Sequence, residues 1–191
     1  MADLTIDIVA DPVCPWCYLG YTRLKAAMEH LGDDFRFDIH WLPFELHPDI
    51  AKLGEPRAQF LGKKFGSQEK LNEVSHALQN VGYEAGLEFN FSEKDIIPNT
   101  KLAHQFIAQA SRINLATPMM VALFYAYFTK GENIGDQSIL ERIAKEVGFQ
   151  PEDIEDALSR EAEYLVDEKM EKLVKLNIQS VPTYIINEQF F

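Results

Sequence analysis

The stretch LTIDIVADPVCPWCYLG, residues 4–20, contains both cysteines of the 191-residue chain. Within it, a pattern typical of a strand ends and a pattern typical of a helix begins. The first six residues of the stretch are β-branched or apolar except for one aspartate, a composition that predicts a buried strand. Asp11-Pro12 ends that strand. Apolar residues then recur at helical spacing until Gly32, a residue type that commonly stops a helix. Cys14 is therefore expected where a strand gives way to a helix.

A second strand is predicted at residues 35–43. Apolar and polar residues alternate there from Phe35 to Trp41, which is the period of a strand with one buried face, and Pro43 ends the pattern. A β-α-β unit joins two parallel strands through a right-handed crossover. We therefore expect residues 4–9 and 35–43 to pair in parallel.

Residues 56–178 carry helical patterns almost throughout. Apolar residues recur every three or four positions, and proline, serine and aspartate stand where helices begin. The acidic stretch 152–171 keeps an apolar stripe, so its acids are expected to form a solvated helix face. After this block, the β-rich tetrad 183–186 predicts a third strand.

Composition narrows the class of protein. Apolar residues make up 47% and charged residues 25%, which is typical of a folded globular chain. The 30 acids outnumber the 18 bases, and no basic cluster is present, so no nucleic-acid partner is expected. The N-terminal residues lack a basic region, and the most apolar window, Met119–Phe128, is shorter than the ~20 residues of a membrane span. We expect a cytoplasmic protein without membrane contact, and a core helix at that window.

The spacing of Cys14 and Cys17, one helical turn apart, is typical of redox chemistry. Only the thiolate is nucleophilic, and a free cysteine thiol has a pKa of about 8.5. At a helix start, unpaired N–H groups and the positive end of the helix dipole favour a thiolate on Cys14, and Pro15 gives up no needed donor. We predict that Cys14 attacks a substrate disulfide and that Cys17 resolves the mixed disulfide.

A purely structural role for the two cysteines fits less well. A cross-link that closes only four residues stabilises little, because the stabilisation grows with loop length. A structural zinc site needs further ligands, and the five histidines supply no second metal-binding pair, so no metal is predicted. Two inert buried thiols would have no reason to lie one turn apart at a strand exit.

Three segments together resemble the DsbA-like thioredoxin superfamily, in particular its FrnE-like branch. They are Asp11-Pro12-Val13-Cys14-Pro15-Trp16-Cys17-Tyr18-Leu19-Gly20, Pro98-Asn99-Thr100-x-x-Ala103-His104 and Val181-Pro182-Thr183. The resemblance covers essentially the whole chain. It implies an α/β fold, in which a discontinuous thioredoxin-like domain (residues 1–55 and 179–191) is interrupted by a large all-helical insertion (residues 56–178).

The resemblance also implies residues of the substrate site. Pro182 is expected to be a cis-proline beside the cysteines, and the backbone of Val181 to pair with the substrate. Trp16, in the turn at the helix start, is expected to be exposed and to offer a platform for peptides. Asn99 and His104 are further candidates for this cleft, although their simplest roles are a helix cap for Asn99 and a hydrogen-bonded core histidine for His104.

Two features depart from the family pattern. Many thioredoxins have a buried acid six residues before the first cysteine, where this chain has Ile8. Asp7 faces the other side of the strand and Asp11 lies in the turn, which leaves the proton acceptor for Cys17 open. At the other end, residues 187–191 look too few for a returning strand and a final helix, so the C-terminal part of the thioredoxin motif is expected to be missing.

The end of the chain allows three interpretations: a truncated chain, a dimer formed through the unpaired edge of strand 183–186, and a disordered terminus. An exposed apolar edge invites pairing with another chain, and Phe190-Phe191 would add unburied aromatic surface. Truncation is the expectation.

The leading functional hypothesis is a thiol-disulfide oxidoreductase that exchanges disulfides with protein or small thiol substrates, with its own redox-active disulfide and no further cofactor. An alternative is a glutathione-dependent transferase or isomerase of the kappa or hydroxychromene-carboxylate isomerase type. The resemblance implies that those relatives have serine where this chain has Cys14. A third possibility is a non-catalytic thioredoxin-like binding module.

Overall fold

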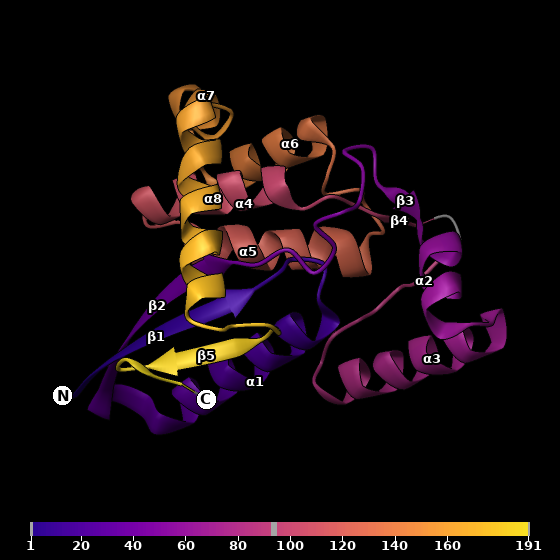
Figure 1. Cartoon of the computed structure of the whole chain (residues 1–191). Coiled ribbons are helices and arrows are strands. Elements are labelled where there is room, and N and C mark those ends of the chain that lie inside the picture. Colours follow the sequence, from indigo (N-terminus) through magenta and orange to yellow (C-terminus); the bar gives the residue numbers. More distant parts are fainter. Residues whose placement is uncertain (1, 93–94, 191) are drawn as a thin grey trace.

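A computed structural model describes residues 2–92 and 95–190 (Figure 1). Helices predominate, and they surround one main sheet. The elements in chain order are β1 (Ala2–Ala10), α1 (Pro15–Leu31), a 3-10 turn (Gly32–Asp34), β2 (Phe35–Pro43), β3 (Glu55–Pro56), α2 (Arg57–Phe65), α3 (Gln68–Glu84), β4 (Ile96–Ile97), α4 (Lys101–Arg112), α5 (Ala116–Phe124), a π-helix (Tyr125–Thr129), α6 (Gln137–Val147), α7 (Pro151–Ala157), α8 (Arg160–Lys175), β5 (Thr183–Ile186) and β6 (Gln189–Phe190).

The main sheet has the strand order β2-β1-β5-β6. β1 and β2 pair in parallel along their whole length, from Ala2 opposite Phe35 to Ala10 opposite Pro43. β5 runs antiparallel to residues 6–9 of β1. The parallel β-α-β unit and the third strand that the sequence predicts are both confirmed.

The two faces of the sheet are buried against different helices. Ile8 belongs to the large core cluster, together with Tyr21 of α1 and Phe124 of α5. The next residue, Val9, points the opposite way, into a smaller cluster with Leu173 of α8. In Figure 1, α1 runs along one side of the sheet and α8 stands on the other. Residues 4–20 are thus held from both sides at the point where β1 passes into α1.

The helical block between β2 and β5 has three features that the sequence patterns did not predict. A two-stranded sheet joins β3 to β4, with Glu55 opposite Ile97. α5 continues into the π-helix, and the acidic stretch is divided into α7 and α8, with Ser159 capping α8. Figure 1 shows α2 and α3 standing apart from the other helices, and we call this pair the α2–α3 arm.

The end of the chain differs from the expectation. β6 pairs with β5, with Ile185 opposite Phe190. The connecting turn contains Asn187 and Glu188 at φ 47° and 66°, and asparagine tolerates this left-handed region. The expectation that the outer edge of β5 is unpaired was therefore wrong at Ile185 and Ile186, because a two-residue turn and two paired residues suffice for a short returning strand. No final helix follows it in the described residues, as the sequence predicts. Phe191 and the side chain of Phe190 lie outside the described part of the chain, and edge-to-edge dimerisation stays a prediction.

The most apolar window of the sequence lies inside the protein. Met119, Leu123 and Phe124 of α5 are fully buried in the large core cluster, as the prediction of a core helix requires. Within residues 2–92 and 95–190, no helix combines the length and the hydropathy needed to cross a bilayer.

Asp136 allows a test of local stability at the start of α6. Its Oδ1 accepts hydrogen bonds from the backbone N–H groups of Ser138 (2.8 Å) and Ile139 (3.3 Å). Asp136→Ala should lower the free energy of unfolding by about 1 kcal/mol in urea denaturation, the usual loss for an N-cap. Asp136→Asn keeps an acceptor and is the matched control; equal losses in both variants would contradict the capping role.

The same cap makes part of the stability depend on pH. The side chain of Ser138, followed by the backbone N–H groups, holds the pKa of Asp136 below its usual range. An acid with a lowered folded-state pKa stabilises above its unfolded pKa, here about 3.9, and loses that contribution as the pH falls. The difference between the wild type and Asp136→Ala should therefore be present at pH 7 and shrink below pH 4.

Candidate active site

Cys14 is the N-cap residue of α1, and Pro15 occupies the first helical position. The turn before it is closed by a hydrogen bond from the Cys14 N–H to the Asp11 carbonyl (2.9 Å). The Cys14 carbonyl in turn accepts from the Cys17 N–H (3.1 Å), which begins the helix. The predicted placement of Cys14 at the positive end of a helix dipole is therefore what the structure shows.

Cys14 and Cys17 are free thiols that lie 3.4 Å apart. The Cys14 thiol donates to the carbonyl of Val181 (Sγ to O, 3.9 Å), and the Val181–Pro182 peptide bond is cis. The structure thus brings together the two cysteines, Val181 and Pro182, although Val181 is 167 positions further along the chain than Cys14.

The two thiols differ in how easily they ionise. A hydrogen bond from the Cys17 side chain, opposed by burial, lowers the pKa of Cys14. Burial, followed by the interactions with Cys14, raises the pKa of Cys17 well above its usual value. Of the two thiols, Cys14 therefore forms the nucleophilic thiolate more readily, and Cys17 keeps its proton more readily.

This difference predicts selective alkylation. At neutral pH, iodoacetamide should modify Cys14 of the reduced protein several-fold faster than Cys17. Both thiols are buried, but only the thiolate reacts, and the pKa is lowered for Cys14 and raised for Cys17. Peptide mass spectrometry over a time course measures both rates. In urea-unfolded protein, the control, the two rates should become similar. Equal rates in the folded protein, or preferential labelling of Cys17, would contradict the predicted roles.

A cavity of about 250 Å³ opens beside Cys14, between the start of α1 and the α2–α3 arm. Its wall is mainly apolar and comes from segments far apart in the sequence. Representative apolar lining residues are Trp16, Leu61, Phe65, Leu71, Phe91 and Val181. A cavity of this kind can take the apolar part of a ligand while leaving a disulfide close to the Cys14 sulfur.

The polar lining of this cavity includes His47, Arg57, Lys64 and Tyr127. Arg57 is buried, donates from Nη2 to the Ser75 hydroxyl (2.9 Å), and lies over the ring of Phe91, 4.5 Å from its centre. Arg57 and Lys64 give the cavity a positive character within a protein of net charge −12. An anionic group on a ligand would be attracted to them.

Of the other predicted residues, Trp16 is 51% exposed and lines the cavity, as a substrate platform requires. Asn99 lies at the start of α4, where Nδ2 donates to Ile50 (3.1 Å) and Oδ1 accepts from the Lys101 N–H (3.1 Å). His104 is buried and bonds from Nε2 to the Phe44 carbonyl (2.9 Å). In the described part of the chain, neither Asn99 nor His104 lines this cavity. The bond of His104 matches a core histidine. The N-cap residue of α4 is Thr100, so the helix cap expected at Asn99 was one residue off.

The sequence did not single out Arg57, Lys64, Tyr127 or Tyr184. Tyr184, in β5, has a buried hydroxyl that finds no hydrogen-bond partner among the described residues. Burial, with the charges of Cys17 and Cys14, raises its pKa to about 12. A Cβ atom on Gly20 of α1 would overlap that hydroxyl, so the glycine makes room for it. Gly20 belongs to the motif that the sequence analysis identified, but nothing in that motif indicates that Tyr184 packs against it.

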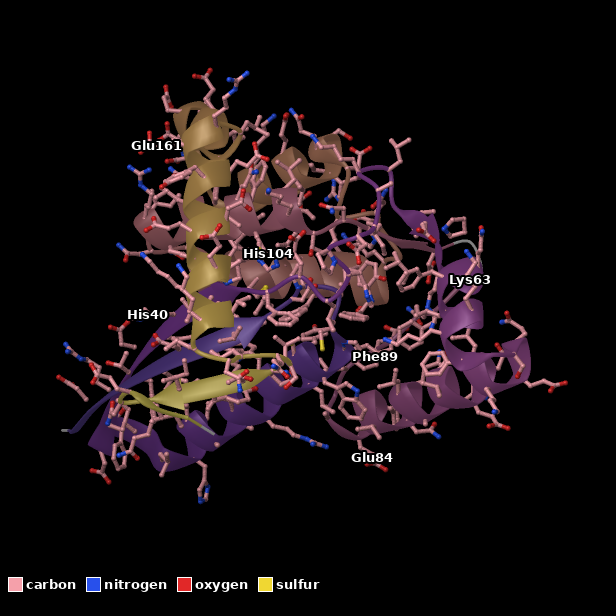
Figure 2. All side chains as sticks on the ribbon, in the orientation of Figure 1. His40, Lys63, Glu84, Phe89, His104 and Glu161 are labelled. Carbon is pink, nitrogen blue, oxygen red and sulfur yellow. The ribbon has the colours of Figure 1, made fainter. Side chains whose placement is uncertain are left out.

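An aromatic cluster packs around the start of α1. Tyr18 stacks on Phe124 of α5 with the ring centres 4.8 Å apart, and Phe89 contacts both Tyr18 and Phe128 of the π-helix. Figure 2 shows Phe89 between α1 and α3. Because such packed rings fix one another's positions, the cysteine turn rests on a rigid base.

The chain belongs to the DSBA-like thioredoxin domain family, because the model of that family matches residues 5–191. A relative in sequence is the uncharacterized protein YwbO of Bacillus subtilis, which is 28% identical over 189 residues, covering 96% of this chain and 86% of YwbO.

Solved structures show the same fold. A probable DsbA oxidoreductase from Streptomyces coelicolor superposes with a TM-score of 0.84 at 23% identity, covering 96% of this chain and 80% of that one. The cytosolic disulfide reductase DsbM from Pseudomonas aeruginosa gives 0.71 at 14% identity (98% and 87%). A 2-hydroxychromene-2-carboxylate isomerase gives 0.72 at 17% identity (98% and 87%). At these identities the likeness establishes a DsbA-like thioredoxin fold.

Within the described ranges, no three histidine, cysteine, aspartate or glutamate side chains gather in a way that could hold a metal ion.

Proposed function

We propose that the protein is a thiol-disulfide oxidoreductase whose reacting groups are Cys14 and Cys17. The observation that carries this proposal is the pair of free thiols, 3.4 Å apart at a helix start. The pKa of Cys14 is lowered and that of Cys17 is raised. This difference suits an attacking and a resolving cysteine.

In the proposed reaction the Cys14 thiolate attacks one sulfur of a substrate disulfide. That S–S bond breaks, the first substrate thiolate leaves and takes a proton from water, and Cys14 is held in a mixed disulfide. Cys17 then gives its proton to solvent and attacks the Cys14 sulfur; the Cys14–substrate S–S bond breaks, and the second substrate thiolate leaves and takes a proton from solvent. The substrate gains two electrons, and the protein ends with a Cys14–Cys17 disulfide. A dithiol substrate drives the same steps in reverse.

The surroundings of Cys14 support both protein and small-molecule substrates. Exposed Trp16 and the Val181 backbone suit a peptide strand, while the adjoining cavity, with Arg57 and Lys64, suits a small anionic thiol. Glutathione is such a compound, and a structure of DsbM contains it. We propose the cytoplasm as the setting, which is where the name of DsbM places that relative.

Insulin reduction tests the proposal. The protein should accelerate the reduction of insulin by dithiothreitol or by glutathione, and the variant lacking both thiols, Cys14→Ser/Cys17→Ser, is the control for the uncatalysed rate. An equal rate for the wild type and the double variant with both reductants would support the non-catalytic binding module instead.

A glutathione-dependent transferase or isomerase is the second candidate, supported by the cavity and by the fold shared with the chromene-carboxylate isomerase. Cys14→Ser separates the two candidates, because it gives the site the serine that the resemblance implies for that class. A variant that keeps glutathione-dependent activity would favour the isomerase type. Loss of all activity in that variant favours the oxidoreductase.

A further inference from the structure

Asp11 is a fully buried carboxylate three residues before Cys14. Its Oδ1 accepts from the Val13 N–H (3.3 Å), which forms a local Asx turn, and its backbone carbonyl accepts from the Cys14 N–H (2.9 Å). Oδ2 accepts from the Leu46 N–H (2.7 Å) in the segment after β2. One side chain therefore fixes the turn that carries Cys14 and joins it to a second segment.

The same carboxylate reaches the helical block. Thr100, the N-cap residue of α4, donates a side-chain hydrogen bond to it, and Nε2 of His104 lies 4.0 Å from Oδ1. Since the Phe44 carbonyl can only accept, His104 carries its proton on Nε2. Asp11 thus stands where β1, the segment after β2 and α4 meet, directly behind the cysteine turn.

Among the described residues, no positively charged group faces this carboxylate at neutral pH. In the described part of the chain, the titratable groups that face it are Cys14 and Cys17 of α1, Glu45 after β2, His104 of α4 and Tyr127 of the π-helix. Burial lowers the pKa of His104 to about 4, so its ring is uncharged near pH 7. Burial, opposed by the hydrogen bonds from Leu46, Val13 and Thr100, raises the pKa of Asp11 itself to about 7.

We propose that Asp11 is a positioning residue that adjusts the reactivity of Cys14: its carboxylate holds the cysteine turn against the helical block, and its negative charge opposes the thiolate on Cys14. This inference rests on the proposed function, because it concerns the attacking thiol of that reaction. Many thioredoxins have their buried acid six residues before the first cysteine, where this chain has the apolar Ile8. Here the buried acid, Asp11, lies three residues before that cysteine.

The charge of Asp11 and the ionisation of the two thiols are coupled, so the proton affinity of Asp11 should change during the redox cycle. The charge of Asp11 raises the pKa of both thiols. When a dithiol substrate reduces the Cys14–Cys17 disulfide, two electrons enter the protein, Cys14 becomes a thiolate and Cys17 takes a proton. The new negative charge must raise the proton affinity of Asp11 by the same free energy by which Asp11 opposes the thiolate, because coupling between two sites is reciprocal. Besides the proton on Cys17, reduction near neutral pH is therefore accompanied by a further, partial uptake of a proton on Asp11.

Asp11→Asn tests the proposal through the pH profile of Cys14 alkylation between pH 5 and pH 9. The amide keeps an acceptor oxygen but removes the charge, so alkylation near pH 7 should become about three- to tenfold faster. The gain should vanish at pH 5, where Asp11 is already protonated in the wild type. Asp7 lies in β1, four residues before Asp11, and pairs with exposed His40 (3.0 Å); Asp7→Asn removes an equal charge and should leave the profile unchanged. A purely structural effect of Asp11→Asn would change the rate equally at every pH, and this result would overturn the electrostatic role.

A second measurement uses the unaltered protein and does not depend on the folding of a variant. Carboxyl carbon NMR of aspartate-labelled protein should show a higher pKa for Asp11 in the reduced than in the disulfide form. Equal values in the two forms would overturn the coupling. Neither readout needs turnover, so a protein that fails the insulin test but shows both effects would refute the proposed function and leave the role of Asp11 intact.

Discussion

Cys14→Ser is expected to abolish disulfide exchange. The serine hydroxyl stays protonated at neutral pH, whereas the wild-type thiol has a lowered pKa at the helix start and can attack. Cys17 cannot replace it, since it is fully buried and burial raises its pKa. Insulin reduction should fall to the uncatalysed rate, and the melting temperature should change little because one oxygen replaces one sulfur.

The matched comparison for this result is Cys17→Ser, which leaves the attacking thiol in place. If Cys14→Ser kept more than about a tenth of the wild-type rate, the attack would have to come from another group, and the assignment of Cys14 as nucleophile would be wrong.

Cys17→Ser is expected to stop the reaction one step later. Cys14 can still attack a substrate disulfide, but no thiol is present to attack the Cys14 sulfur and release the substrate. The variant should therefore accumulate mixed disulfides, visible on non-reducing gels or as added mass in intact-mass spectra, and lost on addition of dithiothreitol. Turnover should fall strongly in the same preparation.

Cys14→Ser/Cys17→Ser, which has no thiol, is the control and should carry no adduct. Glutathione disulfide and a disulfide-containing peptide can be offered separately, so the experiment also compares the two substrate classes that the cavity and Trp16 support. Absence of an adduct with either class, in a folded Cys17→Ser variant, would contradict the two-step mechanism.

The sequence predicts the β1–α1 junction well because the signals there are local. The strand composition, Asp11-Pro12 as its end and Gly32 as the helix stop all act within a few residues, and the structure has Cys14 at the predicted N-cap. Strand 183–186 was identified for the same reason, since four β-formers follow Val181-Pro182.

The cavity could not be predicted in this way. Arg57 begins α2 and Tyr127 lies in the π-helix, so they meet Cys14 only through the packing of the α2–α3 arm and α5. The burial of Asp11 likewise depends on Leu46 and Thr100, neither of which is near it in the sequence. The sequence did not predict the β5–β6 turn because the turn needs a positive φ at Glu188 as well as at Asn187. Contacts with a distant segment stabilise this conformation: the Thr5 N–H of β1 donates to Asn187 Oδ1, and the Asn187 N–H donates to the Thr5 carbonyl (3.0 Å each).

Whether Cys14 and Cys17 form a redox pair can be decided by counting free thiols in the native protein. We expect two thiols after treatment with dithiothreitol, none after a mild oxidant such as oxidised glutathione followed by its removal, and two again after renewed reduction. The oxidised protein should carry no covalent link to a second chain and should have an intact mass lower by two hydrogens, which shows that the disulfide joins Cys14 to Cys17. Two free thiols that persist after the oxidant, or an oxidised product linked between chains, would contradict the redox pair.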